Sequence, residues 1–432
     1  MRFYSLNKQS PPVGFGEAAV LGQAPDKGLY FPESIPMQEK DFFQHIEKIP
    51  DDEIAFRVIK PYTGNEIPDD ILYTIVRDAI NFPIPLEKVA DDVYSLELFH
   101  GPTMAFKDIG ARFMSRCLAH FVKNKGQKLT VLVATSGDTG GAVADGFFEV
   151  PGVDVVILFP SGKVSHIQEK QLTSYGKNIT ALEVAGNFDD CQMMVKRAFV
   201  DKDLHAKLFL TSANSINVAR WLPQQVYYFF AWKQWGYKNQ PPVISVPSGN
   251  FGNIGAGLLA HISGLPVKHF IAACNANDVV PRFLDTGIYR PVKAIPTISN
   301  AMDVGDPSNF IRVMQMFNHS FVDVKKKMKA YRITDDETRL AMADLYENYN
   351  YQADPHGAVG YLSLQKFISE NKGSKGIFLE TAHPVKFLQE IKITGLSNTP
   401  FGKRIHELLA KPSHALKIEA DYTALKEYLI TS

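Results

Sequence analysis

The sequence predicts an α/β protein in which two open lobes, each built on a mostly parallel sheet, follow a small and mainly helical N-terminal region. Two observations indicate this fold. First, apolar runs at 129–134, 153–160 and 179–186 are each followed by a segment with a helical pattern. Strands this apolar, alternating with helices, are typical of a parallel sheet covered by helices on both faces. Second, a chain of 432 residues is long enough for two or three domains.

We divide the chain into an N-terminal region at 1–92, a first lobe at 93–235 and a second lobe at 236–432. The N-terminal region is rich in proline and acidic residues, and its helical patterns lie at 40–49 and 69–82. It contains no strong chemical motif. We therefore look for function in the two lobes.

The lobes are separated by the break GYKNQPP at 236–242. A long helix is predicted before it, at 215–235, and strands are predicted after it, at 243–247, 267–275 and 376–380. Ligands of open parallel sheets bind at the carboxyl ends of the strands. The strand-to-helix turns are therefore the candidate sites.

Composition excludes some classes of partner. Lys+Arg and Asp+Glu are equal at 46 each, so no net field favours nucleic acid or an anionic membrane. No apolar run approaches the roughly 20 residues that span a bilayer, and the three cysteines match no zinc or redox spacing. We expect a cytoplasmic protein, and we interpret the lysine run at 325–329 as a solvated helix face.

The segment VISVPSGNFGNIGAG is the best-defined turn. A strand ends at Pro247, and glycines then open the start of a helix. Backbone N–H groups there can approach an anion closely, and the helix contributes its positive end. A phosphate on the amides of residues 249–253 is the functional interpretation. A tight turn with close helix packing is the alternative.

Two further turns carry polar side chains at helix starts. ATSGDTGG places the hydroxyls of Thr135, Ser136 and Thr139 where a carboxylate could bind, although an ordinary helix cap explains them as well. SANSINVARW places Arg220 one and a half turns after a polar helix start, and its guanidinium suits a phosphate. The alternative is a capped helix with a surface arginine.

Lys107, in HGPTMAFKDIGARF, lies among apolar and turn residues. A lysine whose pKa is lowered can form a Schiff base with a carbonyl cofactor. One such lysine and one glycine-lined phosphate site are the minimum apparatus for pyridoxal 5′-phosphate. Most lysines are bystanders, so the assignment needs the other motifs. For Asp108 we expect a local structural contact.

Several segments in register resemble the threonine synthases of the bacterial and fungal type, which are tryptophan-synthase-β-like (fold type II) pyridoxal-phosphate enzymes. The segments are HGPTMAFKDIGARF, TSGDTGGAVA, NSINVAR, VPSGNFGNIGAG and TAHPVKF. The similarity covers nearly the whole chain, including GLYFPESIP in the N-terminal region. The resemblance implies that the cofactor lies between the two lobes.

The resemblance also implies roles for individual residues. Lys107 would be the Schiff-base lysine, and Thr381 the hydroxyl partner of the pyridine nitrogen. The cofactor phosphate would be held by Gly249, Asn250, Phe251, Gly252 and Asn253. The substrate would be held by Thr135, Ser136 and Thr139 at its carboxylate, and by Asn214, Ser215, Asn217 and Arg220 at its phosphate. Asp138 belongs to the cofactor site with an open role, because relatives of this fold often carry Asn there.

The implied reaction converts O-phospho-L-homoserine and water to L-threonine and phosphate, by γ-elimination and then β-addition of water. The alternatives are another fold type II lyase, such as a threonine/serine dehydratase or an amino-phospholyase, and a non-catalytic ligand-binding relative. We expect a monomer or a homodimer, with no bound metal.

His356 and His383 fall in turns that form the site, and a structural role is the alternative for each.

Overall fold

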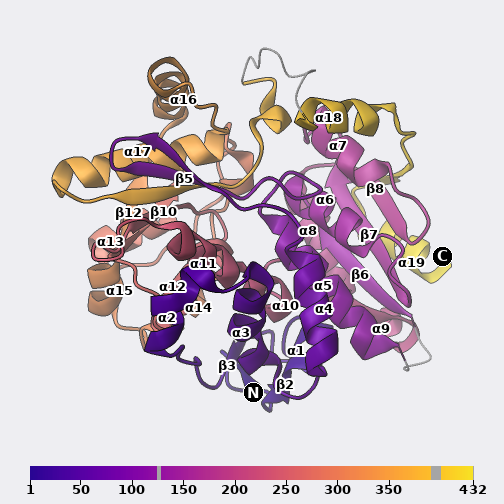
Figure 1. Cartoon of the computed structure of the whole chain (residues 1–432). Helices are drawn as coiled ribbons and strands as arrows, with labels where there is room; N and C mark the ends of the chain where they lie inside the picture. The colour runs from indigo at the N-terminus through magenta and orange to yellow at the C-terminus, as the bar shows by residue number, and fades with distance from the viewer. Residues whose placement is uncertain (124–127, 391–399, 432) are drawn as a thin grey trace.

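The computed structural model describes residues 1–123, 128–390 and 400–431. Two α/β lobes lie side by side, and the N-terminal region packs beneath them (Figure 1). Among the described residues, each lobe has one large sheet whose strands are parallel, apart from the edge strand β4 (Leu86–Ala90). This architecture confirms the predicted fold class.

The lobe on the right of Figure 1 is built on a five-stranded sheet. Its strands, in spatial order, are β14 (Ala415–Glu419), β8 (Ile179–Ala185), β7 (Val153–Pro160), β6 (Leu129–Ala134) and β9 (Phe209–Ser212). Its helices are α6 (Asp138–Phe147), α7 (His166–Thr173), α8 (Phe188–Ala198), α9 (Lys202–Lys207), α18 (Pro400–Ala410) and α19 (Tyr422–Thr431). All of β6 is buried, as an apolar central strand of a covered parallel sheet should be.

The lobe on the left is built on a six-stranded sheet. Its strands, in spatial order, are β12 (Met328–Arg332), β11 (His269–Cys274), β10 (Val243–Pro247), β13 (Gly376–Glu380), β5 (Val93–Glu97) and β4. Its helices are α12 (Gly252–Ile262), α13 (Val279–Thr286), α14 (Phe310–Met316), α15 (Phe321–Lys327), α16 (Asp335–Tyr349) and α17 (Pro355–Glu370). Short 3-10 helices lie at η3 (Asn300–Met302) and η4 (Pro384–Phe387).

The N-terminal region contains a small antiparallel sheet as well as the expected helices. The strands are β1 (Arg2–Ser5), β2 (Val13–Gly14) and β3 (Tyr30–Pro32). The helices are α1 (Phe15–Leu21), α2 (Lys40–His45), η1 (Ile46–Lys48), α3 (Asp51–Thr63) and α4 (Asp69–Ala79). The strands are too short for an alternating pattern to stand out in the sequence.

The sheets cut across the segments into which we divided the sequence. Strand β5, expected to open the first lobe, pairs with β13 in the sheet of the second lobe. Strand β14, from the C-terminal segment, pairs with β8 and completes the sheet of the first lobe. Hydrogen-bond partners in a sheet are chosen by tertiary packing, so sequence order alone cannot assign a strand to a lobe.

Two local predictions were wrong in part. The helix predicted at 215–235 consists of α10 (Val218–Trp221), the 3-10 turn η2 (Leu222–Gln224) and α11 (Gln225–Gln234). Pro223 lacks the backbone N–H that an α-helix requires at that point. The lysine run is also not one helix face, because α15 ends at Lys327 and strand β12 begins with the next residue.

The N-terminal region, both lobes and the helices between them share one apolar core. Its largest fully buried side chains include Trp221, which packs against Phe31 of β3, and Trp235, which packs against Tyr94 of β5. Within the described ranges, no helix is both long enough and apolar enough to cross a membrane. The core holds the two lobes and their strand-to-helix turns in a defined arrangement.

Candidate functional site

Lys107 is the first residue of helix α5 (Lys107–Val122). The segment before it lies against the segment after β13. The N–H of Phe106 donates to the carbonyl oxygen of Thr381 over 2.9 Å, and Ala105 forms a bridge with Ala382. The hydroxyl of Tyr227 donates to the carbonyl oxygen of Phe106. These contacts bring Thr381 beside the start of α5, although the two residues are far apart in the sequence.

The amine of Lys107 has no carboxylate partner among the described residues. Burial lowers its pKa from 10.5 to about 8; the nearby charge of Asp138 opposes this shift, whereas those of Lys386 and Arg220 add to it. The pKa is therefore close to neutral pH. A lysine in this state can act as a nucleophile and as a base.

Asp138, the first residue of α6, forms a buried ion pair with Lys386. Its Oδ1 accepts from Lys386 Nζ at 2.9 Å and from Gln168 Nε2 at 3.0 Å. The two charged side chains are 4% and 0% exposed. Burial alone would raise the pKa of Asp138, but the charges of Lys386 and Lys107 and the two hydrogen bonds hold it well below its usual range. Asp138 is therefore ionised. Its pairing with Lys386 explains how a carboxylate can occupy a position where relatives of this fold often carry Asn.

The glycine-rich turn after β10 has a geometry that suits an anion. Phe251 adopts a left-handed conformation, with φ of 60°, and turns the chain sharply into α12. The first three backbone N–H groups of α12 have no partner within the helix. The side chain of Asn253 accepts from Tyr228 through Oδ1, whereas its buried Nδ2 has no acceptor among the described residues. These unpaired donors and the helix dipole suit a phosphate.

In the turn before α6, the hydroxyl of Thr135 bonds to backbone groups of the same turn. Thr135 Oγ1 accepts from the N–H groups of Gly137 and Gly140 at 3.0 and 2.9 Å, and it donates to the carbonyl oxygen of Gly137. Thr135 thus caps the turn, as the alternative interpretation proposed. The partly exposed side chains of Ser136 and Thr139 make no such bond among the described residues.

Arg220 is buried, with 2% of its surface exposed. Its Nη1 donates to the carbonyl oxygen of Ala213 at 2.5 Å, but its Nε has no acceptor in the described part of the chain. Burial lowers its pKa from 12.5 to about 10, with Tyr227 and Asp108 opposing the shift. Arg220 is therefore not a surface arginine. A buried guanidinium without a carboxylate partner is costly unless an anion binds to it.

Asn217 has a structural role. Its Oδ1 caps α10 by accepting from the N–H of Ala219 at 2.9 Å. Its Nδ2 donates to the carbonyl oxygens of Ala19 and Ser212. All its hydrogen-bonding groups are engaged and the residue is fully buried, so it anchors this loop to α1. Asn214, by contrast, is partly exposed.

We call the glycine-rich turn at 249–253 the phosphate-type turn. Side chains join this turn to the loop before α10. Asn250 Nδ2 donates to Ser215 Oγ over 2.7 Å, and Asn309 Nδ2 donates to the same hydroxyl over 3.3 Å. Asn250 Oδ1 accepts from the N–H of Ser308. Gly249 faces the backbone of Met302 so closely that a Cβ would lie 2.6 Å from its Cα. Residues 300–309 therefore close over the turn.

The two histidines have structural partners. His383 Nδ1 accepts from the N–H of Val385, and burial lowers its pKa to about 3, so the ring is neutral. His356 Nε2 accepts from the N–H of Ala301 at 3.2 Å, which leaves the ring hydrogen on Nδ1, facing Asp354. His356 thus helps to hold the segment over the phosphate-type turn.

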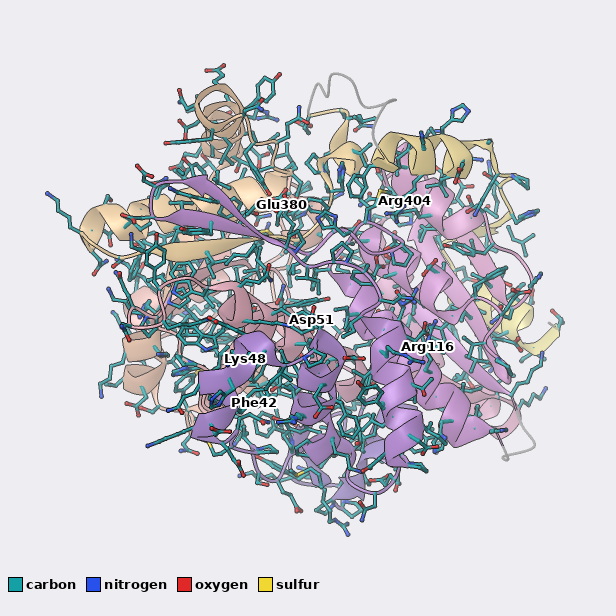
Figure 2. All side chains as sticks on the ribbon, viewed as in Figure 1. Phe42, Lys48, Asp51, Arg116, Glu380 and Arg404 are labelled. Carbon is teal, nitrogen blue, oxygen red and sulfur yellow. The ribbon has the colours of Figure 1, made fainter. Side chains whose placement is uncertain are left out.

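Asp108 makes the local contact that we expected. Its carboxylate accepts from both the hydroxyl and the N–H of Thr103. This contact stabilises the turn before Lys107. Arg404, labelled in Figure 2, donates to the carbonyl oxygens of Gly101 and Pro102 and joins α18 to the same turn.

Four residues that the sequence reasoning missed are central to this geometry: Gln168, Asn309, Arg312 and Lys386. Lys386 was present in the segment TAHPVKF but was not singled out. The other three carry no motif signal, because each acts through a contact between distant segments. Arg312, for example, donates to Tyr30 in the N-terminal region and to Ile216.

The arrangement fits pyridoxal 5′-phosphate. The cofactor requires an amine with a lowered pKa, donors for a phosphate and a partner for the ring nitrogen. Lys107 is such an amine, the first turn of α12 offers the donors, and Thr381 lies beside the start of α5. The orphaned Nδ2 of Asn253 marks a position for an additional acceptor.

Comparisons with known proteins identify the family. Residues 81–379 match the family described as pyridoxal-phosphate dependent enzyme. Residues 2–80 match the threonine synthase N terminus, and residues 357–429 match the threonine synthase C-terminal family.

Comparisons with individual proteins support the same family assignment. The chain is 42% identical over 431 residues to threonine synthase of Escherichia coli (strain K12), with 100% of this chain and 99% of the relative covered. The crystal structure of threonine synthase from Escherichia coli matches with a TM-score of 0.91 at 40% identity and covers 100% of both chains. The PLP-bound threonine synthase from Brucella melitensis has a TM-score of 0.90 at 33% identity, with 99% of this chain and 98% of that chain covered. The chain therefore belongs to the threonine synthase family of pyridoxal-phosphate-dependent enzymes.

Proposed function

We propose that the enzyme converts O-phospho-L-homoserine and water to L-threonine and phosphate. The observation that carries this proposal is the presence of two separate positions for an anion near one reactive lysine. One is the first turn of α12, with the orphaned Nδ2 of Asn253, and the other is the buried guanidinium of Arg220. A cofactor phosphate and a substrate phosphate together require two such positions.

The cofactor would be held by Lys107 at its aldehyde, by the first-turn amides after Phe251 at its phosphate, and by Thr381 at its ring nitrogen. A hydroxyl partner leaves the ring nitrogen largely neutral, in contrast to a carboxylate partner. The carboxylate of Asp138 belongs to the same site and is paired with Lys386. Asn250 acts as a support, because both ends of its amide are bonded to protein groups.

The substrate would be held at both ends. Arg220, Ser215 and the partly exposed Asn214 would bind its phosphate. Ser136, Thr139 and the free amides at the start of α6 would bind its carboxylate. Thr135 and Asn217 would stabilise the two loops rather than contact the substrate, because their polar groups are already bonded to protein groups.

Pyridoxal phosphate, when bound, supplies an electron sink that delocalises carbanion charge. Lys107 contributes the proton transfers at Cα, since its pKa of about 8 leaves much of the amine neutral near pH 7.5 to 8. The Arg220 guanidinium orients the phosphate that departs from Cγ. The burial of Arg220 and of the residues around Lys107 limits the access of bulk water to the reacting groups.

We further propose that the enzyme acts in the cytoplasm as a monomer or a homodimer. Its three cysteines are buried free thiols, which suits a reducing compartment. Light scattering on the purified protein distinguishes the two assembly states by mass. A larger mass would contradict this part of the proposal.

The reaction is tested by supplying O-phospho-L-homoserine to the purified enzyme loaded with cofactor and measuring both products. We expect threonine and phosphate in equal amounts. Lys107→Ala is expected to lower kcat by at least about 1,000-fold, because both the cofactor tether and the base are lost. The control is Lys372→Ala, since Lys372 is exposed in the turn between α17 and β13. Formation of ammonia and 2-oxobutyrate without threonine would contradict the assignment.

A further inference from the structure

We propose that Lys386 is a positioning residue for this reaction: by taking up the charge of Asp138, it keeps the amine of Lys107 free to bind the cofactor. The proposal rests on the proposed role of Lys107. It assigns separate duties to two lysines in one site, the buried Lys386 and the partly exposed Lys107. Lys107 reacts, and Lys386 pairs with Asp138 and fixes the electrostatic surroundings.

The first argument is the geometry of the pair. Lys386 Nζ lies 2.9 Å from Asp138 Oδ1, and both side chains are almost completely buried. An ion pair this well enclosed cannot exchange its partner for water. Removal of one member leaves an uncompensated buried charge, which is strongly unfavourable.

The second argument is the hydrogen-bond direction around Asp138. Gln168 uses its Oε1 to accept from the N–H of Ser165, at the start of α7. Its Nε2 must therefore be the group that faces Asp138 Oδ1, and it donates there over 3.0 Å. Asp138 Oδ1 thus accepts from two donors, Gln168 and Lys386. Oδ1 therefore carries no proton, and the adjoining positive charge of Lys386, its counter-ion, lowers the pKa of Asp138 and favours the ionised carboxylate.

The third argument concerns the charges around Lys107. Asp138 from α6, Lys386 from η4 and Arg220 from α10 are the charged groups that influence its amine, within the part of the chain that the structure describes. Asp138 is the single anion in this set. Its short contact is with Lys386 rather than with Lys107. Were Lys386 absent, Asp138 would hold a proton on Lys107 and block its attack on a carbonyl.

The fourth argument is that the backbone places Lys386 firmly. His383 caps η4 through Nδ1, and the N–H of Lys386 donates to the carbonyl oxygen of His383 over 3.1 Å. Phe387 packs against the ring of His356, with the ring centroids 5.2 Å apart. These contacts fix the backbone from which the Lys386 side chain extends toward Asp138. The same turn follows Thr381, so the ring-nitrogen partner and the counter-ion are set by one short segment.

The test is the pH dependence of cofactor loading. Full-length protein is stripped of cofactor, mixed with pyridoxal 5′-phosphate at a series of pH values, and followed by rapid-mixing absorbance. The rate reports the fraction of Lys107 that is unprotonated. Ionisations of the added cofactor are common to every variant and cancel in the comparison. No turnover of substrate is involved.

We expect opposite shifts from the two halves of the pair. Lys386→Met should move the midpoint of the rate profile up by about 1 pH unit, because Asp138 then pairs with Lys107. Asp138→Asn should move it down by about 1 unit, because a positive charge is left without its anion. The double variant and Lys386→Arg should both return the midpoint to that of the unaltered protein.

A shift in the same direction for both single variants would overturn the proposal, as would a double variant that behaves like Lys386→Met. A purely structural role for Lys386 predicts slower loading with an unchanged midpoint. If Lys386→Met does not fold, Asp138→Asn and the double variant still decide the sign. Lys107→Ala separates the two hypotheses: if it loads cofactor with the original profile, the assignment of Lys107 fails rather than that of Lys386.

Discussion

The amide of Asn250 donates to the hydroxyl of Ser215 over 2.7 Å and so joins the phosphate-type turn of one lobe to the loop before α10. In the sequence these residues belong to separate motifs with separate expected ligands. In the structure each positions the other. A change at Ser215 should therefore affect the binding of both cofactor and substrate.

Ser215→Ala removes the acceptor for Asn250 and for Asn309. Leaving these amides without an acceptor costs about 1 to 2 kcal/mol. We expect the KM for the phosphorylated substrate and the dissociation constant for pyridoxal phosphate each to rise about 10-fold. Ser369→Ala, on the exposed end of α17, is the control and should change neither. A rise in KM alone would mean that the two sites are not coupled through Ser215.

Arg220→Met should separate stability from function. The buried guanidinium has one bonded nitrogen and an unpaired Nε, so an apolar replacement should raise the free energy of unfolding of the cofactor-free protein by about 1 kcal/mol. The kcat/KM for the phosphorylated substrate should fall at least about 100-fold, because a charged contact is lost. Denaturant unfolding and steady-state kinetics measure the two effects.

The matched control is Arg312→Met. Arg312 is equally buried, but its Nε, Nη1 and Nη2 donate to Tyr30, Asn309 and Ile216. We expect this variant to lose about 3 kcal/mol of unfolding free energy. Equal destabilisation by both variants would show that Arg220 is a structural residue.

Asn217→Ala should act on stability. The variant loses the cap of α10 and leaves the carbonyl oxygens of Ala19 and Ser212 without their donor. The expected loss of unfolding free energy is about 2 to 3 kcal/mol. Asn348→Ala, on the exposed face of α16, removes an amide that bonds Asp344 alone among the described residues and should lose less than about 0.5 kcal/mol. Normal stability with a raised KM would instead place Asn217 in direct contact with substrate.

Glu380 should make stability depend on pH. It lies at the end of β13, toward the centre of the view in Figure 2. Burial, together with the charge of Asp354, raises its pKa well above the ordinary value, so the folded protein holds this carboxyl protonated. The raised pKa of Glu380 contributes fully to the free energy of unfolding below the unfolded-state pKa, near 4.5. This contribution is lost as the pH rises toward the folded-state pKa, because the unfolded chain releases the proton first.

Glu380→Gln keeps the shape of the protonated acid and removes the titration. We expect the variant to unfold at higher denaturant concentration than the unaltered protein at pH 8, with a difference that shrinks toward pH 5. Urea unfolding at a series of pH values measures it. A constant difference across this range would show that Glu380 is ionised in the folded state.

The amino-acid pattern predicted most of the strands that build the site. The apolar runs at β6, β7 and β10 have the predicted bounds, because a strand buried on both faces is apolar at nearly every position. The short strands of the N-terminal region and the partner of β5 were not predictable in this way. Their pairing is set by segments far away in the chain.

The candidate site, like the strands, was predicted from the sequence only in part. The sequence singled out Lys107, the glycine-rich turn and Arg220 as candidates, through their residue types and through the family resemblance of the segments that contain them, and their roles stay predictions. Only the tertiary structure decided that Asp138 stays ionised, since its counter-ion Lys386 comes from a turn 248 residues away. The physical reason is that charge compensation in a buried site depends on which groups lie within a few ångströms, and folding alone sets those neighbours.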